Sequence, residues 1–160
     1  AYQILSTPYT AKFFIGFKEA LAFKESQGKY LKINSLGYLG KYQFGPETLR
    51  EIGVYNHQYF LQNANLQEQA FLVLLAKNKW DLQDEIDTFS GKTISGVCVT
   101  ESGILAAAHL GGVRSVKRFL YSQGKRKCRD QYGSSVRSYM RDFGGFETAC
   151  IVAKNNPKVK

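Results

Sequence analysis

The apolar residues near the start of the chain recur at helical spacing. Within residues 11–25, Phe14, Phe17 and Leu21 lie three or four positions apart, which places them on one face of a helix. The next position on this face is Glu25. We therefore predict a helix whose buried face ends at a single carboxylate.

The following segments predict a change of structure and then two more helices. Glycines and aromatic residues crowd positions 37–44, a composition that predicts a short β-hairpin or a turn-rich loop. A helix is expected from Pro46 to Gly53, because proline is favoured in the first helical turn and glycine after the last. Residues 66–80 are rich in apolar side chains on every side, which predicts a helix buried all round at the centre of the domain.

The second half of the chain predicts helices as well. Small residues dominate positions 103–110, which would let a neighbouring backbone approach closely, and Gly111 and Gly112 interrupt this helix before the next one begins. A last helix near 134–143 would point four apolar side chains inward: Val136, Tyr139, Met140 and Phe143. Residues 155–160 are polar and basic, and we expect 150–160 to form a flexible tail.

Length and charge limit the possible partners. A chain of 160 residues that is 44% hydrophobic fits one domain, here 1–160, with its core in about 11–145. The formal net charge of +9 favours a polyanion: nucleic acid, an anionic membrane or an acidic cell-wall polymer. No apolar run approaches the roughly 20 residues that span a bilayer, so we expect no membrane span.

Cysteine spacing and the first residues add two expectations. Cys98, Cys128 and Cys150 lack the spacing of metal ligands, so we expect no metal site and no cofactor; the thiols are either buried or form one disulfide with one thiol to spare. The opening residues lack the charged start and apolar block of a secretory signal. Without an initiator Met, the chain is expected to be a processed product or an excised domain.

Glu25 is the candidate for chemistry. A carboxylate at the end of an apolar face, next to a loop rich in Tyr and Phe, is costly to ionise and can serve as a proton donor near neutral pH. Glycosidases need such a donor, because the departing sugar oxygen must be protonated as the oxocarbenium-like transition state forms. Nearby aromatic rings offer flat surfaces for sugars, and Gln43 offers an amide for hydroxyl or acetamido groups. The plain alternative is that Glu25 ends a helix in solvent.

Three segments together resemble a known family. Glu25-Ser26, followed by Gly37-Tyr-Leu-Gly-Lys-Tyr-Gln43, resembles the Glu-Ser and Gly-x-x-Gly-Leu-Met-Gln signatures of lytic transglycosylases and goose-type lysozymes, with Tyr42 in place of Met. Ala106-Ala-Ala-His-Leu-Gly-Gly112 resembles their Ala-Ala-Tyr-Asn-x-Gly segment. Tyr139 could supply their late Tyr.

The resemblance implies a fold and an activity. The fold would be mainly α, of the lysozyme-like α+β type, a helical bundle around a central buried helix with a small β-hairpin lobe beside a glycan cleft. The activity would be cleavage of the β-1,4 bond between N-acetylmuramic acid and N-acetylglucosamine in peptidoglycan, with Glu25 as general acid. The expected substrate-binding residues are Ser26, Tyr38, Tyr42, Gln43, Phe44, His109 and Tyr139.

The segment 106–112 departs from the family's pattern at two positions. Ala108 and His109 replace the usual Tyr and Asn, which puts the contacts of that helix with substrate in question. His109 is either packed or faces the cleft, whereas His57, in a polar stretch, is expected on the surface.

The carboxylates favour one reaction type. A hydrolase needs a second acid beside the first, yet no carboxylate lies between Glu25 and Glu47. Glu47 follows Pro46 in the first turn of a helix, and Glu101 follows Thr100, an expected N-cap, so both have a structural explanation. A lytic transglycosylase uses groups of the substrate as internal nucleophiles, so one acid suffices. The sequence therefore favours transglycosylation over hydrolysis.

Other functions compete with this interpretation. An inactive peptidoglycan- or chitin-binding module would keep the cleft without catalysis, and a chitinase-like glycoside hydrolase would need the second acid. Nucleic-acid binding is suggested by the basic residues 125–129 and by Arg114, Lys117 and Arg118, but bacterial wall polymers suit the same charge, and we expect no nucleic acid partner. We expect a monomer, secreted or periplasmic, that acts on glycan strands and is controlled by an inhibitor or immunity protein.

Overall fold

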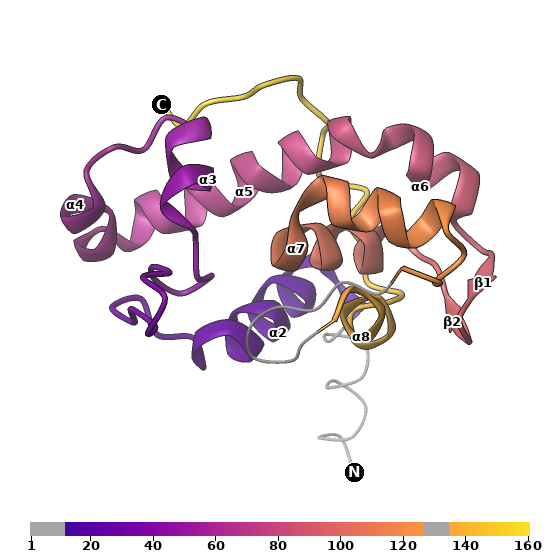
Figure 1. Ribbon diagram of the computed structural model, residues 1–160. Coiled ribbons are helices and arrows are strands. Elements are labelled where there is room, and N and C mark those ends of the chain that lie inside the picture. The colour runs from indigo at the N-terminus through magenta and orange to yellow at the C-terminus, as the bar shows by residue number, and fades with distance from the viewer. Residues whose placement is uncertain (1–11, 127–134) are drawn as a thin grey trace, which may run out of the picture.

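Helix α5 (Ala64–Asp81) runs along the length of the molecule and connects its two sides (Figure 1). The computed structural model describes residues 12–126 and 135–160. Near the start of α5 lie a loop of residues 29–45, α3 (Pro46–Glu51) and α4 (His57–Gln62); near its end lie α6 (Gln83–Phe89), α7 (Glu101–Tyr121) and α8 (Val136–Asp142). We call these the loop lobe and the helical lobe.

The helix that ends at Glu25 forms as predicted. Helix α2 spans Phe14–Ser26, and Phe17 and Leu21 are fully buried. Gln27 takes a left-handed conformation with φ of 56°, and its backbone N–H bonds back to the last turn, which ends the helix. The carboxylate of Glu25 therefore lies in the last turn, as expected.

Helix α5 is central but not buried on all sides, which corrects the expectation. Phe71 and Leu75 are fully buried, whereas Leu72 is 42% exposed. An apolar run cannot show which of its faces the rest of the chain will cover. Asn63 caps this helix by accepting a hydrogen bond from the backbone of Leu66.

Helix α7 is bent at the glycine pair. Gly112 has φ of 82° and ψ of 164°, a conformation that interrupts the helix and that glycine adopts without strain. Close packing explains the small residues before it, because a Cβ at Gly103 would lie 2.8 Å from the carbonyl oxygen of Met140 in α8. Both predictions for this helix are confirmed.

The last described helix also agrees with prediction. Helix α8 begins after Ser135, whose side chain caps it by accepting from the backbone of Ser138. Its four apolar side chains are buried, as expected: Val136, Tyr139, Met140 and Phe143. The proposed start at residue 134 lies outside the described residues.

The fold is mainly helical with one small antiparallel hairpin, which confirms the predicted class. Strands β1 (Thr93–Ile94) and β2 (Val97–Cys98) form that hairpin, at the far end of the helical lobe from the loop lobe (Figure 1). Residues 37–44, where a hairpin was one expectation, instead form the turn-rich alternative, with isolated bridges from Leu39 to Ile33 and to Phe44. The β-hairpin therefore does not lie beside the groove described below.

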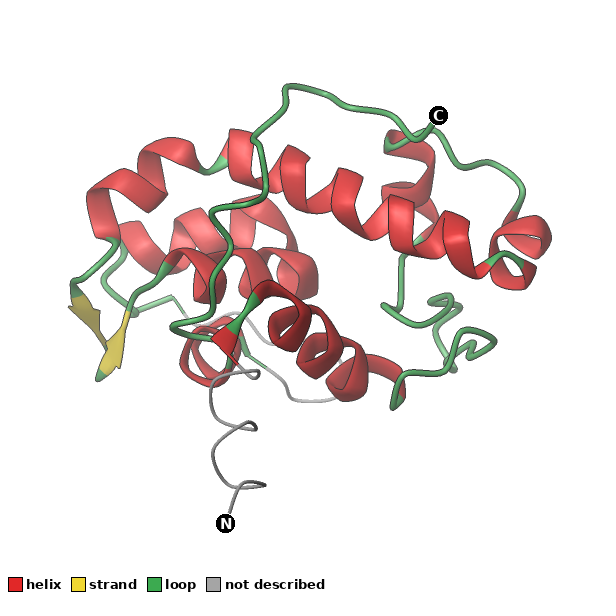
Figure 2. Ribbon diagram, turned by 180° about the vertical axis from the view of Figure 1, so that it is seen from behind, coloured by secondary structure: helices red, strands yellow, loops and turns green. Residues whose placement is uncertain are grey.

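The C-terminal segment differs from the expected tail. It runs back across the molecule as an extended loop (Figure 2). The backbone of Lys154 donates to the carbonyl of Ala76, and that of Val159 donates to the carbonyl of Ile52, at 3.0 and 2.8 Å. Residues 150–160 are thus tied to α5 and to the end of α3, although their polar composition predicted a free tail.

The described cysteines differ from the expectation of buried thiols or a disulfide. Cys98 and Cys150 are exposed free thiols rather than buried ones, while Cys128 lies outside the described residues. His57 is exposed, as expected.

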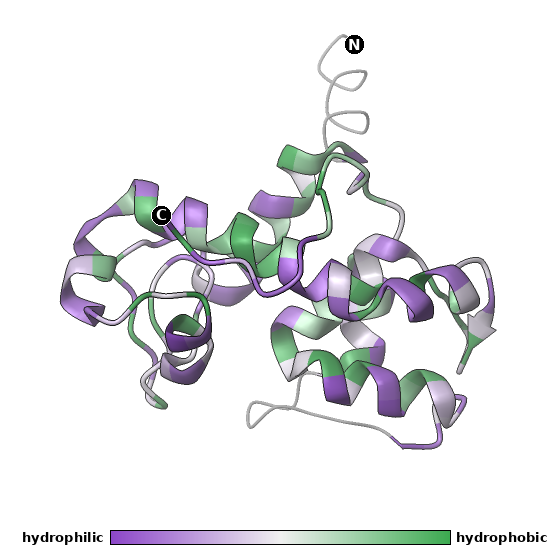
Figure 3. Cartoon of the chain, turned by 90° about the horizontal axis from the view of Figure 1, so that it is seen from above, coloured by the Kyte–Doolittle hydropathy of each residue, from purple (hydrophilic) through white to green (hydrophobic). Residues whose placement is uncertain are grey.

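Hydrophobic and hydrophilic residues alternate along most of the helices, as Figure 3 shows, and the buried residues form one core. In the part of the chain that the structure describes, no helix combines the length and apolarity needed to span a bilayer.

Candidate active site

Glu25 and Tyr139 meet although they lie far apart in the sequence. The hydroxyl of Tyr139 in α8 donates to Oε1 of Glu25 at 2.7 Å. Tyr139 is 2% exposed, so its ring is held by the core, whereas Glu25 is half-buried. The other carboxylate oxygen, Oε2, has no partner within residues 12–126 and 135–160. One oxygen is fixed, and the other is left for a ligand or a proton.

Ser26 is a tether rather than a contact for substrate. It is fully buried, and its hydroxyl donates to the carbonyl of Lys41 at 2.6 Å while it accepts from the backbone of Lys29 at 3.0 Å. A side chain with no exposed surface cannot touch a ligand. The expectation that Ser26 binds substrate is corrected: it ties the end of α2, and with it Glu25, to the loop lobe.

A groove separates the two lobes. It has a volume of about 450 Å³, within the range of ligand sites. Its walls come from residues 38–51 of the loop lobe and 108–114 of α7, and residues 74–81 of α5 lie between them. Four of the expected binding residues line it together: Tyr38, Gln43, Phe44 and His109.

Gln43 presents one hydrogen-bond acceptor to the groove. Its Nε2 donates to the carbonyl oxygens of Gly40 and Lys32, at 2.9 and 3.3 Å, which uses both amide hydrogens. The oxygen Oε1 has no partner among the described residues. Because both neighbours are carbonyls, the nitrogen must face them, and the oxygen is left for a ligand.

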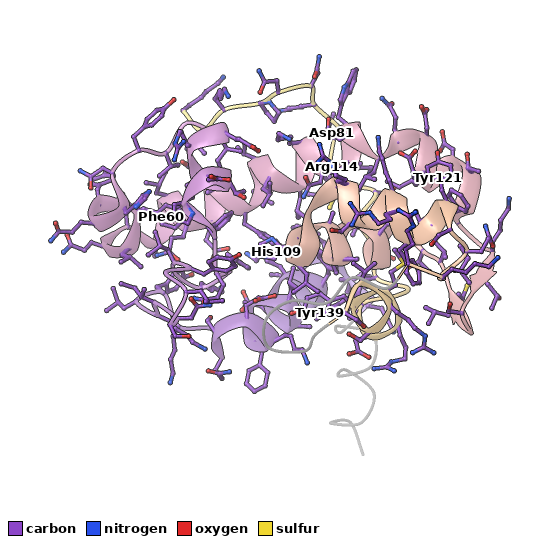
Figure 4. All side chains as sticks on the ribbon, in the orientation of Figure 1. Phe60, Asp81, His109, Arg114, Tyr121 and Tyr139 are labelled. Atoms are coloured by element: carbon purple, nitrogen blue, oxygen red, sulfur yellow. The ribbon has the colours of Figure 1, made fainter. Side chains whose placement is uncertain are left out.

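His109 joins the helical lobe to the loop lobe. Its Nε2 lies 2.6 Å from the carbonyl oxygen of Tyr42, and since a carbonyl only accepts, Nε2 carries the proton. Figure 4 shows His109 on the side of α7 that faces the loop lobe. Phe44 and Phe71 pack edge-on against the ring. The Nδ1 atom is buried without a partner in the described part of the chain. His109 therefore contributes a ring surface to the groove and holds its wall in place.

Tyr42 does not line the groove, contrary to expectation. It is fully buried and stacks on Phe71 with ring centroids 3.9 Å apart. Its hydroxyl donates to Glu68 at 2.6 Å. Burial and this hydrogen bond raise the pKa of Tyr42 well above its ordinary value. Tyr42 thus anchors the loop to α5.

Glu68 is the centre of a charged cluster that fixes the loop lobe. Its carboxylate accepts from Tyr30 and Tyr42, both at 2.6 Å, and pairs with Lys41 and Lys18 at 2.9 and 3.1 Å. Burial opposes ionisation of Glu68, but these hydrogen bonds outweigh it and lower its pKa to about 2. The carboxylate is therefore ionised at neutral pH and committed to the fold.

Lys41 extends the cluster to α2. It is 6% exposed and pairs with Glu19 and Glu68, each at 2.9 Å. Burial disfavours its charged form, yet hydrogen bonds to the two carboxylates outweigh burial and raise the pKa of Lys41. Together with the Ser26 bond, the cluster connects α2, the loop and α5. These contacts hold Gln43 at a fixed position relative to Glu25.

Two carboxylates line the groove, and neither was a candidate from the sequence. Asp81 pairs with Lys77 at 3.0 Å, and Glu51 lies 3.9 Å from the same lysine. Both belong to the groove, whereas Glu25 is not among its lining residues. The groove therefore holds two candidates for a second acid, and both lie near the single positive charge of Lys77.

Glu47 and Glu101, the acids that the sequence analysis assigned to helix starts, have structural roles, as expected. Glu47 is exposed in the first turn of α3. Glu101 lies in the first turn of α7 after the N-cap Thr100, where it accepts from Thr148 and pairs with Lys79 at 3.2 Å. Neither lines the groove.

The basic residues that suggested nucleic-acid binding lie on α7 and just after it. Arg114 lines the groove next to the kink of α7, and Figure 4 labels it beside Asp81. Lys117 lies 3.9 Å from Glu85. Of the basic stretch 125–129, only residues 125 and 126 are described, and both are exposed. No group of three or more His, Cys, Asp or Glu residues that could hold a metal occurs in the described ranges.

Comparison with known proteins adds no relative. No protein-family model, curated protein or solved structure matches the chain. The case for a function therefore depends on the residues and their geometry.

Proposed function

We propose that the protein cleaves peptidoglycan as a muramidase, at the β-1,4 bond between N-acetylmuramic acid and N-acetylglucosamine, by lytic transglycosylation. The observation that carries the proposal is the Glu25–Tyr139 pair at 2.7 Å, which leaves the other carboxylate oxygen without a partner among the described residues, at the end of α2. A general acid needs this arrangement, because it must be oriented and still able to deliver a proton.

The groove between the lobes supports a glycan as the ligand. Its walls combine aromatic rings, Tyr38 and Phe44, with polar groups such as Gln43, which is the usual composition of a ligand site and offers flat surfaces for sugar rings. The Ser26 bond to Lys41 and the His109 bond to Tyr42 connect Glu25 to this wall. A glycan strand of several sugars would extend from the groove to the acid.

In the proposed reaction, Glu25 protonates the glycosidic oxygen as the bond to the anomeric carbon breaks. The acetamido group of the N-acetylmuramic acid unit assists at the anomeric carbon, and its 6-hydroxyl then attacks that carbon. Glu25, now a carboxylate, accepts the proton of the 6-hydroxyl. The product is a 1,6-anhydro sugar, no water is consumed, and a second protein carboxylate is not needed.

Two alternatives give different outcomes in the same test. An inactive peptidoglycan- or chitin-binding module would bind glycans unchanged. A lysozyme or chitinase-like hydrolase would need a second acid, for which Asp81 and Glu51 are the candidates in the groove. For a transglycosylase or a lysozyme the site of action would be the bacterial wall, reached by secretion or in the periplasm.

The decisive experiment is to digest purified peptidoglycan and measure the masses of the products. Anhydro ends, lighter by one water than reducing ends, are expected. Reducing ends would instead indicate a hydrolase, and no release of fragments by the folded protein would support the binding module. Glu25→Gln provides the control, since any activity that survives this change comes from another group.

A further inference from the structure

Asn78 is a largely buried residue whose side-chain amide has no hydrogen-bond partner in residues 12–126 and 135–160. It lies on α5 and is only 5% exposed. The amide itself still reaches the surface, because the buried side-chain polar atoms without a partner in the described residues do not include those of Asn78. Polar groups this close to the core are usually paired within the protein, so the free amide calls for an explanation. Asn78 lines the groove, so the small exposed part of this side chain faces the place where a ligand would lie.

The groove offers a matching group on another wall. Gln43, from the loop lobe, presents only the acceptor Oε1, because its nitrogen is already used by two carbonyls. Asn78, from α5, can donate through Nδ2. The surfaces near them are apolar, since Phe44, Leu74 and Ala108 also line the groove.

A secondary amide complements this arrangement. In a trans amide the N–H and C=O groups point in opposite directions, so it needs an acceptor on one side and a donor on the other. An acetamido group also carries a methyl group that suits an apolar wall. A hydroxyl donates and accepts from a single oxygen atom, so it cannot span two groups on different walls as an amide does, and it carries no methyl group.

We propose that Asn78 is a specificity-determining residue that binds the acetamido group of an N-acetylhexosamine. Its Nδ2 donates to the acetyl carbonyl, while the amide N–H of the sugar donates to Oε1 of Gln43. This inference depends on the proposed function for the idea that a glycan fills the groove. It adds which feature of the sugar is read and by which residue of α5.

The test measures binding of two uncharged trisaccharides, tri-N-acetylchitotriose and cellotriose, by calorimetry. Both have β-1,4-linked glucose rings, and only the first carries acetamido groups. The Glu25→Gln protein is used so that nothing is cleaved. We expect it to prefer the acetylated sugar by at least about tenfold, as befits one or two hydrogen bonds to buried groups.

The variants assign this preference to Asn78. Asn78→Ala, and Asn78→Asp, which keeps the shape but loses the donor, should both reduce the preference about tenfold. Asn65→Ala, at an exposed position on the same helix, is the matched control and should keep it. Thermal unfolding confirms that each variant is folded. An unchanged preference in both Asn78 variants, or equal binding of the two sugars by the Glu25→Gln protein, would overturn the assignment.

Failure of this inference is distinguishable from failure of the proposed function. If the protein selects the acetylated sugar through Asn78 but releases no fragments from peptidoglycan, the proposed reaction is wrong and the assignment of Asn78 stands. If peptidoglycan is cleaved in a Glu25-dependent manner while the Asn78 variants retain full preference, the assignment alone is wrong.

Discussion

The hydroxyl of Tyr139 donates to Oε1 of Glu25 at 2.7 Å, across 114 positions of the sequence. This bond joins α8 to the last turn of α2, and both residues are backed by the core, through Phe17 and Leu21 on one side and Met140 on the other. The orientation of the carboxylate is therefore set by the fold of the helical lobe.

Glu25→Gln should abolish the release of fragments from peptidoglycan. Glutamine keeps the shape and can still accept from Tyr139, but it has no proton to give, and loss of a general acid typically lowers the rate by about 10²-fold to 10⁴-fold. The measurement is the initial rate of turbidity loss with purified sacculi. Glu47→Gln, exposed in the first turn of α3, is the control and should keep the wild-type rate. Near wild-type lysis by folded Glu25→Gln would mean that the acid is misassigned.

Tyr139→Phe should slow cleavage by about tenfold without unfolding the protein, because it removes one hydrogen bond to a half-buried carboxylate and keeps the packed ring. The effect should be on kcat and not on KM, since Tyr139 is 2% exposed and orients the acid rather than contacting sugar. Steady-state rates on a soluble glycan fragment test this. A change confined to KM would indicate that Tyr139 binds substrate instead.

His109 offers a test of how the groove is held. His109→Phe removes the donor to Tyr42, leaving its carbonyl unpaired, and should lower the free energy of unfolding by about 1–3 kcal/mol. His109→Gln supplies a new N–H and should recover part of that loss. Denaturant unfolding of the three proteins is the measurement. Equal stability of the Phe and Gln variants would show that the bond to Tyr42 contributes little.

The sequence predicted the long helices better than the short strands. The helix that ends at Glu25, the break at Gly112 and the inward face of α8 follow from local spacing and from backbone preferences, so they could be predicted from the residues alone. The β-hairpin was missed, although Ser95-Gly96 between short β-prone runs is a hairpin signal. Short runs of this kind carry too little periodicity to stand out.

The candidate site was predictable only in part. Glu25 and Gln43 could be found because they belong to short motifs, and Tyr38 and Phe44 because they flank them. Asn78 could not be found, because nothing in the sequence distinguishes it from the other polar residues of 66–80, and only the folded structure shows that it is 5% exposed and lines the groove. Ser26 and Tyr42 lay in the right segments, but both hydroxyls are bound inside the protein. Ser26 donates to Lys41, 15 positions away, and Tyr42 donates to Glu68, 26 positions away, and such distant contacts cannot be predicted from local spacing.

The Glu68 cluster predicts how stability depends on pH. The pKa of Glu68 is lowered from 4.5 to about 2 in the folded protein, so its contribution is fully present above pH 4.5 and is lost as the pH falls toward 2. Glu68→Gln should therefore destabilise the protein at pH 6 and make little difference at pH 2. Denaturant unfolding of both proteins at pH 6, 4 and 2 tests this. If the difference in unfolding free energy between the wild type and Glu68→Gln stays constant over this range, it does not come from the ionisation of Glu68.

The last prediction separates transglycosylation from hydrolysis by means of Asp81. Among the described residues that line the groove, Asp81 and Glu51 are the carboxylates, and they share one counter-ion, Lys77, at 3.0 and 3.9 Å. If substrate groups supply the nucleophiles, neither acid takes part in the reaction. Asp81→Asn and Glu51→Gln should then release anhydro products at rates within about threefold of the wild type, a change that corresponds to less than about 1 kcal/mol in the barrier.

A hydrolase predicts the opposite result. An acid that activates water or stabilises the oxocarbenium ion contributes orders of magnitude, so its removal should abolish cleavage as completely as Glu25→Gln does. Mass spectrometry of the products of both variants, alongside the wild type, distinguishes the two cases directly. Loss of activity in Asp81→Asn, together with reducing ends from the wild type, would assign Asp81 as the second acid. It would replace transglycosylation by hydrolysis while leaving Glu25 as the proton donor.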